Sequence, residues 1–243
     1  MLNLSLPPTA RRGRRGRLLA AAATLAAPLL LAAMGGCSPA QASVRAPAPA
    51  VDITTANAAQ PQTAILAGGC FWGLQGVFEH VRGVRQVLAG YAGGKQGTAN
   101  YELVSTGTTG HAESIKIVFD PRQITYGEIL RIYFSVATDP TQVNQQFPDS
   151  GPQYRSEVFY LDPAQKTVAQ RYIAQLNAAR IYQRPIATRV DPSSGFFRAE
   201  AYHQDYLVRH PDAPYIATYD LPKVADLRTL FPAQYQAKPV TAL

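Results

Sequence analysis

The sequence contains few cysteines and few histidines, and both shortages limit the classes of protein that it can encode. Two cysteines, Cys37 and Cys70, occur in 243 residues, which excludes a disulfide-stapled scaffold and a cysteine-rich zinc site. The sequence has four histidines: His80, His111, His203 and His210. They form neither an H-E-x-x-H motif nor another spacing typical of metal ligands. We therefore expect neither a metal nor another cofactor.

Acidic residues are absent from the start of the chain, which has the order of a secretory signal. Five arginines between Arg11 and Arg17 precede an apolar run from Leu18 to Met34. This run is short for a membrane span of about 20 residues, so a signal peptide over residues 1–36 is favoured over a transmembrane anchor. We expect an exported bacterial protein that resides in the periplasm.

The end of the apolar run offers two processing sites. Met34-Gly35-Gly36-Cys37-Ser38 resembles the lipobox of bacterial lipoproteins, and lipidation of Cys37 would anchor the protein to a membrane. The second interpretation is cleavage after Ala40-Gln41-Ala42, which would remove Cys37 altogether. We favour lipidation, and both interpretations predict export.

Basic charge is scarce once the signal is removed. The whole chain has a formal net charge of +7, and loss of the five arginines in residues 1–36 leaves +2. No basic block remains, so we do not expect nucleic acid as a partner. Contact with a membrane is expected only through the lipid anchor.

Residues 37–62 contain little that can build a core. Ala, Pro, Thr and Gln dominate from Ser43 to Gln62, which predicts a flexible tether. Residues 63–243 are numerous enough to bury a proper core, and we expect them to form one catalytic domain.

Hydrophobic periodicity predicts a mixed domain. Strands are expected at Thr63–Ala67, Val84–Tyr91, His111–Phe119, Arg155–Tyr160 and Pro185–Val190. Helices are expected from Cys70 onward, from the capping box at Thr125–Glu128 towards Ala137, and from the Asp162 cap to about Ala179. This order favours an α+β fold, a two-layer sandwich of ferredoxin-like type, with a long irregular C-terminal extension whose one short helix covers Glu200–Arg209.

Cys70 stands at a predicted strand-to-helix junction, directly after Gly68 and Gly69. Free amide groups and the positive dipole end of the helix favour a thiolate there. The glycines allow close backbone approach, and Phe71 and Trp72 provide an apolar wall beside the sulfur. A buried inert cysteine is the alternative, but this position favours catalysis.

Five linked motifs resemble those of the peptide methionine sulfoxide reductase A family. They are Gly69-Cys70-Phe71-Trp72-Gly73, Asn100-Tyr101, Gly110-His111-Ala112-Glu113, the segment from Asp139 to Ser156, and the segment from Ala199 to Gln204. The resemblance extends in a shared order from about Ala64 to Gln234. It implies an oxidoreductase that reduces methionine S-sulfoxide, free or in proteins, and so repairs proteins after oxidative stress.

The resemblance implies that Cys70 is the nucleophile and becomes a sulfenic acid. Phe71 and Trp72 would then hold the methyl group of the substrate. No cysteine follows Cys70 in the chain, so we expect an external thiol reductant, either a thioredoxin-like protein or a small thiol.

Proton delivery to the sulfoxide oxygen is assigned, again by resemblance, to Glu113, Tyr101 and Tyr154, while Asp149 would polarise the site. The chemistry fits these roles, because a thiolate that attacks the sulfur of S=O needs an acid to protonate an otherwise poor leaving oxide. Glu113 must be protonated when the substrate binds, which requires that apolar surroundings raise its pKa.

A cysteine hydrolase or acyltransferase is the second hypothesis, with Cys70 activated by His111 or His203. It lacks a third orienting residue. We expect His203 to be structural. A non-enzymatic surface adhesin is a third hypothesis, although an adhesin would not need the Gly-Cys-Phe-Trp-Gly turn.

Overall fold

The computed structural model of the chain describes residues 43–53 and 60–242. The predicted signal peptide and Cys37 lie outside the described residues. Within the described part, no helix is both long and apolar enough to cross a membrane.

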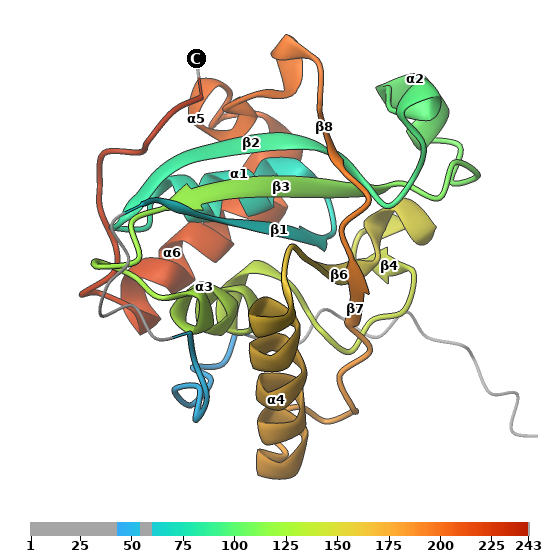
Figure 1. Cartoon of the computed structure of the whole chain (residues 1–243). Helices are drawn as coiled ribbons and strands as arrows, with labels where there is room; N and C mark the ends of the chain where they lie inside the picture. The colour runs from blue at the N-terminus through green and yellow to red at the C-terminus, as the bar shows by residue number, and fades with distance from the viewer. Residues whose placement is uncertain (1–42, 54–59, 243) are drawn as a thin grey trace, which may run out of the picture. The chain divides into compact units, whose positions relative to one another are not determined.

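A six-stranded sheet forms the centre of the domain (Figure 1). Its strands lie side by side in the order β7 (Arg189–Pro192), β6 (Ser156–Tyr160), β1 (Gln62–Gly68), β3 (Ala112–Phe119), β2 (Val84–Ala92) and β8 (Phe196–Arg198). Neighbouring strands are antiparallel except β6 and β7, which are parallel. A separate hairpin pairs β4 (Gln145–Gln146) with β5 (Asp149–Ser150). The fold is therefore a mixed α+β fold, as predicted.

The helices differ in length, and several of them are a single turn long. The longer ones are α1 (Phe71–Glu79), α3 (Tyr126–Ile132), α4 (Pro163–Ala179) and α6 (Leu221–Leu230). The short α-helices are α2 (Tyr101–Val104) and α5 (Tyr206–Arg209). Further helical turns are η1 (Gln96–Thr98), η2 (Tyr133–Ala137), η3 (Pro152–Tyr154), η4 (Ala201–His203) and η5 (Ile216–Asp220).

Two helix starts that were predicted from side-chain caps are confirmed. Before α3, the Glu128 N–H donates to Thr125 Oγ1 over 3.2 Å, and the Glu128 carboxylate accepts from the Thr125 N–H, which completes a capping box. Before α4, Asp162 Oδ1 accepts the Gln165 N–H over 2.8 Å, and Pro163 occupies the first turn.

Helix α1 is fixed to the sheet by its apolar face. Leu74, Val77 and Phe78 are buried in the same core as Ile115 and Ile117 of β3. Each such side chain contributes about 1.5–3 kcal/mol when it leaves water. The start of α1, where Cys70 lies, is therefore held in a constant position relative to β1 and β3.

The C-terminal part differs from its expected structure. The predicted helix Glu200–Arg209 is divided into η4 and α5, because Asp205 between them adopts a left-handed conformation with a φ of 54°. Helix α6 was not expected at all. Its buried apolar side chains are few, chiefly Val224 and Leu227, so its periodic pattern is weak in the sequence.

The last strands also differ from the prediction. The strand expected over Pro185–Val190 begins only at Arg189 and ends at Pro192 as β7. Strand β8 pairs with β2 at the opposite edge of the sheet and was not expected. The segment after α4 thus adds one strand to each edge.

Residues 43–53, here named the strap, belong to the segment predicted to be a tether, and they are packed on the domain beside α3 (Figure 1). Arg131 of α3 donates to the carbonyl oxygen of Ala46 over 2.8 Å, and Ala46 is buried. The Tyr172 hydroxyl of α4 donates to the carbonyl oxygen of Pro47 over 2.7 Å. The strap is therefore joined to two helices by hydrogen bonds.

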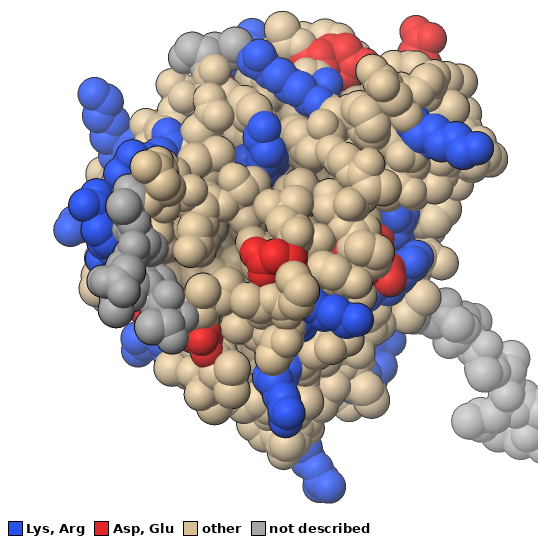
Figure 2. Space-filling view, viewed as in Figure 1, with Lys and Arg blue, Asp and Glu red and all other residues tan. Residues whose placement is uncertain are grey.

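The charged side chains on one face of the protein are dispersed. Figure 2 shows Lys and Arg side chains on the face seen in Figure 1, more closely spaced at its left edge than at its centre. Among the described residues, the centre of this face therefore lacks the continuous basic patch that is typical of nucleic-acid binding.

Candidate active site

Cys70 lies between the end of β1 and the first residue of α1, as its N-cap. Cys70 is 9% exposed, and its thiol forms no disulfide bond. The preceding Gly69 has a φ of 101°, and a Cβ added there would lie 2.7 Å from the Cβ of Gln146. Only glycine fits this turn, so the turn can bring Cys70 directly to the helix start.

The thiol of Cys70 is protonated in the substrate-free protein, contrary to the thiolate that the helix start led us to expect. Burial raises its pKa well above the ordinary value, and the negative charges of Glu113 and Asp220 raise it further. The backbone N–H of Trp72 at the helix start lowers the pKa, as predicted, but this effect is smaller than that of burial. The expectation was wrong because it considered the helix without the loss of water around the sulfur.

Glu113 is held next to Cys70 by a backbone hydrogen bond. It is buried on β3, and its Oε2 accepts the N–H of Phe71, the residue after Cys70, over 3.0 Å. Burial raises the pKa of Glu113 to about 8; this hydrogen bond lowers it, and the charges of Asp149 and Asp220 raise it. At neutral pH the carboxyl group therefore carries a proton that it can donate.

Tyr101 and Tyr154 reach the same place from two short helical turns. Tyr101 begins α2, where its N–H donates to Glu200 Oε1 over 3.0 Å, and Tyr154 ends η3. Burial raises the pKa of both phenols above the ordinary value. Both hydroxyl groups therefore stay protonated beside the thiol and the carboxyl group.

The indole of Trp72 is held from three sides. It stacks on Tyr206 with ring centroids 3.9 Å apart, and the ring of Tyr215 meets it edge-on at 6.0 Å. Its Nε1–H donates to His203 Nδ1 over 3.1 Å. Burial lowers the pKa of His203, so the imidazole is neutral and keeps its proton on Nε2. His203 is thus a positioning residue for Trp72, and its ring centroid also lies 5.0 Å from that of the buried Phe71.

Asp149 joins the site through the C-terminal segment. It lies on β5, and its Oδ2 accepts the hydroxyl proton of Tyr215. Burial raises the pKa of Asp149, and this hydrogen bond and Lys223 lower it. All predicted site residues within the described part of the chain therefore converge at the junction of β1 and α1.

Three further residues of the site were missed in the sequence: Tyr206, Tyr215 and Asp220. Asp220 is buried, Lys223 Nζ lies 3.1 Å from its Oδ1, and its Oδ2 has no hydrogen-bond partner. A Cβ added to Gly73 would lie 2.1 Å from Asp220 Oδ1, so the carboxylate packs directly on α1. No spacing or motif indicated these residues, and the tyrosine-rich composition of the segment was the only signal.

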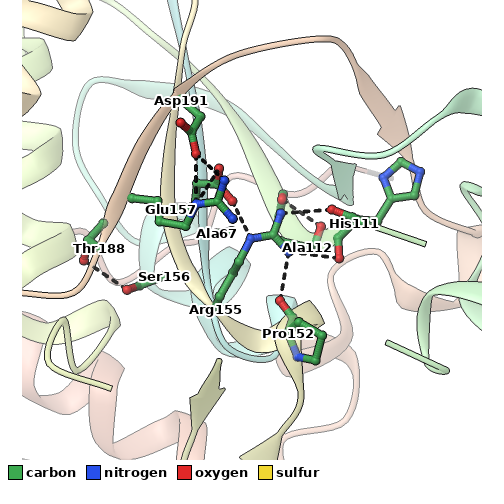
Figure 3. Close-up of polar contacts among 12 residues, drawn as sticks. Ala67, His111, Ala112, Pro152, Arg155, Ser156, Glu157, Thr188 and Asp191 are labelled. Atoms are coloured by element: carbon green, nitrogen blue, oxygen red, sulfur yellow. Dashed lines mark hydrogen bonds and ion pairs between the residues drawn. The ribbon is translucent and has the colours of Figure 1, made fainter. Parts of the chain in front are cut away.

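A buried arginine, Arg155, joins the turn that contains Pro152 to the loop before β3 (Figure 3). The guanidinium of Arg155 donates to the carbonyl oxygens of Gly110, His111 and Pro152 over 3.0, 3.3 and 2.9 Å. These carbonyls belong to the turn before Tyr154 and to the loop before β3. Arg155 therefore fixes Tyr154 relative to the strand that carries Glu113.

The same arginine is paired with a second buried glutamate. Arg155 Nε lies 2.5 Å from Glu157 Oε2, and Arg189 lies 3.8 Å from the other carboxylate oxygen. Burial raises the pKa of Glu157 to about 7; a hydrogen bond with Asp191 adds to this, and Arg155 opposes it. We name Arg155, Glu157, Arg189 and Asp191 the arginine cluster.

The histidines proposed as partners for Cys70 have other interactions. His111 is buried, its Nδ1 accepts the Gly94 N–H over 3.2 Å, and its Nε2 lies 3.0 Å from the carbonyl oxygen of Lys95. His203 is bound to Trp72. The described residues also contain no group of three or more His, Cys, Asp or Glu side chains that could hold a metal ion.

Comparison with known proteins gives one family. The family model described as peptide methionine sulfoxide reductase matches residues 62–234. Peptide methionine sulfoxide reductase MsrA 2 of Mesorhizobium japonicum is 56% identical over 182 residues, which cover 75% of this chain and 93% of the relative. Peptide methionine sulfoxide reductase MsrA of Thermus thermophilus is 46% identical over 170 residues, covering 70% of this chain and 95% of the relative.

Solved structures show the same likeness. Mxr1 from Saccharomyces cerevisiae in reduced form is 30% identical with a TM-score of 0.58, covering 65% of this chain and 90% of that chain. Methionine sulfoxide reductase A of Corynebacterium diphtheriae is 30% identical with a TM-score of 0.54, covering 71% of this chain and 91% of that chain.

Proposed function

The chain belongs to the peptide methionine sulfoxide reductase family, and on this premise we propose how its residues reduce methionine sulfoxide. Cys70 attacks the sulfur of methionine S-sulfoxide, free or within a protein. The oxygen moves to the sulfur of Cys70, which becomes a sulfenic acid, and methionine is released. The S–O bond of the sulfoxide breaks as a bond between that oxygen and the Cys70 sulfur forms, so the sulfoxide sulfur is reduced while the cysteine sulfur is oxidised. The sulfenic acid carries the proton that Glu113 donates to the oxygen, and the thiol proton returns to the Glu113 carboxylate, so atoms and electrons balance.

Glu113 supplies the proton that makes this attack feasible. Its carboxyl group is protonated at neutral pH, and it is bound to the N–H next to Cys70. A proton donated to the sulfoxide oxygen makes the sulfur more electrophilic and allows the S–O bond to break as the oxygen moves to Cys70. The hydroxyl groups of Tyr101 and Tyr154, also protonated, hold the same oxygen, while Asp149 polarises the site.

The observation that carries the proposal is the placement of a protonated carboxyl group and a buried thiol at one helix start, joined through Phe71. The partly buried indole of Trp72 would contact the substrate methyl group, and the buried ring of Phe71 would complete the apolar surroundings. A hydrolase would need a histidine base at Cys70, whereas His111 and His203 are engaged elsewhere.

A single-turnover experiment tests the proposal. Protein is mixed with excess methionine S-sulfoxide in the absence of thiol, and both products are measured by mass spectrometry. We expect one methionine per Cys70 and a trappable sulfenic acid on that residue. The Cys70→Ser variant is the control. Ester cleavage without any reductant would instead favour the hydrolase.

We also propose that an external thiol restores Cys70. Cys70 is the one cysteine among the described residues, and no cysteine follows it in the sequence. A thioredoxin-like protein or a small thiol would condense with the sulfenic acid, and a second thiol would release the mixed disulfide. A peptide map that contained a Cys37 to Cys70 disulfide after turnover would contradict this.

Export, lipidation and periplasmic location remain proposals that the sequence supports. The arginine-rich start, the apolar run and the small residues before Cys37 predict an exported lipoprotein. We expect the mature protein to enter the detergent phase on phase separation. If the Cys37→Ser variant still enters the detergent phase, lipidation of Cys37 is not the cause.

The core of the sheet supports the proposed ferredoxin-like arrangement. The strands β6, β1, β3 and β2 lie in that order and each is antiparallel to its neighbour, with α1 between β1 and β2 and α3 between β3 and β6 in the chain. An experimental structure in which β1 and β3 were parallel would contradict it.

A further inference from the structure

A cavity of about 280 Å³ lies at the surface beside the active site. Much of its lining is apolar, from Val44, Phe134, Val136, Phe147, Tyr182 and Tyr219. Pockets that hold whole small molecules start at about 300 Å³, so this cavity suits a single large side chain.

Two contacts connect the cavity wall to the site. Gln146, in the wall, lies against Gly69, because a Cβ on that glycine would be 2.7 Å from the Cβ of Gln146. The ring of Tyr219, also in the wall, lies 5.2 Å from the ring of Tyr215, whose hydroxyl binds Asp149. A polypeptide bound at Cys70 would therefore pass close to the cavity.

The charged groups of the lining already have partners. Lys223 Nζ lies 3.1 Å from Asp220 Oδ1. The carboxylate of Asp139 accepts from Thr141 Oγ1 over 2.7 Å and from Gln142 Nε2 over 3.0 Å. With these charges paired, the cavity presents aromatic and aliphatic surface together with uncharged polar groups such as those of Ser135, Thr138 and Gln146.

Phe147 has apolar surface that an occupant would cover. The residue is 46% exposed, and its ring meets Tyr219 edge-on at 5.9 Å. It follows Gln146 on the same hairpin that carries Asp149. Burial of such an aromatic surface by a bound chain is favourable.

We propose that this cavity binds a large apolar side chain of the substrate polypeptide, at a residue close in sequence to the methionine sulfoxide. The inference rests on the proposed function and adds a preference among its substrates. Oxidised proteins with Leu or Phe at that position would be repaired faster than those with Gly. Free methionine sulfoxide has no side chain for the cavity.

The test compares pairs of peptides that contain methionine sulfoxide and differ at one residue, Leu in one and Gly in the other. One pair is made for each of the two positions on either side of the sulfoxide. We expect one position to give a kcat/KM ratio of roughly tenfold or more in favour of Leu, given the contribution of burying that side chain.

Substitutions in the cavity wall test whether the cavity causes this preference for Leu over Gly. Tyr219→Ala and Phe147→Ala should each bring the ratio towards one. Val143→Ala is the matched control, because Val143 is 67% exposed near the same hairpin but does not line the cavity, and the parent ratio should persist. A parent ratio near one at all positions would overturn the proposal, as would a ratio retained in both aromatic variants. Absence of turnover with every sulfoxide would instead overturn the proposed function itself.

Discussion

Glu113 and Glu157 are buried in the same sheet, yet their surroundings differ. Glu157 lies 2.5 Å from the guanidinium of Arg155 and shares a hydrogen bond with Asp191. Glu113 accepts a backbone N–H, and the charges that act on it come from the acids Asp149 and Asp220. Of these two carboxyl groups, the one paired with a cation serves the fold, whereas the one beside Cys70, without a cation, keeps a proton for chemistry.

Removal of the nucleophile should have the largest effect. Cys70→Ser should abolish turnover, because a hydroxyl group does not provide the nucleophilic sulfur. Methionine release is measured in the presence of excess thiol. The far-UV circular dichroism and the Tm should match those of the parent, since the arginine cluster is unchanged. Undiminished turnover in this variant would show that another group attacks the sulfoxide.

Replacing each glutamate with glutamine should separate the two roles. Glu113→Gln should lower kcat roughly a hundredfold, the usual scale for loss of a general acid, with KM little changed. Glu157→Gln is the matched control, and we expect its kcat to stay within about threefold of the parent because this residue donates no proton to the substrate. If kcat fell equally in the two variants, Glu113 and Glu157 would not have the different roles assigned to them.

The pH dependence should report the titration of Glu113. Its pKa in the folded protein is about 8, so the donating form is present below that pH and is lost above it. We expect kcat/KM to be level on the acid side and to fall above a pH of about 8. Glu113→Gln should remove this fall and Glu157→Gln should retain it. A fall that persists in Glu113→Gln would assign the titration to another group.

Loss of Arg155 should affect stability more than rate. Arg155→Ala leaves Glu157 buried without its cation, which costs roughly 3–5 kcal/mol of unfolding free energy near pH 8. We expect a decrease of only severalfold in kcat, from looser placement of Tyr154. Urea unfolding and initial rates measure the two effects.

The stability loss should also depend on pH with a definite sign. The pKa of Glu157 is already raised in the folded state, to about 7, and removal of Arg155 raises it further. The variant should therefore lose stability relative to the parent as pH rises through neutrality, and it should be least affected near pH 5. Arg189→Ala is the control, because Arg189 is farther from Glu157 and its side chain is 58% exposed. A loss that did not change with pH would mean that Glu157 is not the group left unpaired.

The sequence predicted those parts of the molecule that depend on local signals. The capping box at Thr125 and the Asp162 cap are contained in a few adjacent residues, and both helices start where predicted. The glycines before Cys70 likewise indicated its place between strand and helix. Such features follow from backbone geometry and neighbouring side chains, without knowledge of the rest of the fold.

What the sequence did not predict depends on distant contacts. Tyr206 and Tyr215 flank Trp72, and Asp220 packs on α1, only because the C-terminal segment folds back onto the catalytic helix. The protonated state of Cys70 has the same origin, since burial and carboxylates from other elements outweigh the local helix start. The hydrophobic periodicity of the sequence could not predict where these residues lie, because the spacing of apolar residues in this segment depends on the surface of the domain that it covers.

The contact between Gly73 and Asp220 has a consequence for the evolution of the family. The carboxylate occupies the space that a side chain at position 73 would need. An enzyme that acquires alanine at this position must therefore shorten or move residue 220, and one that enlarges residue 220 must keep glycine. Positions 73 and 220 are far apart in the chain, yet we expect them to change together among related sequences. Counting which pairs of residues occur at these two positions in an alignment of relatives would test this.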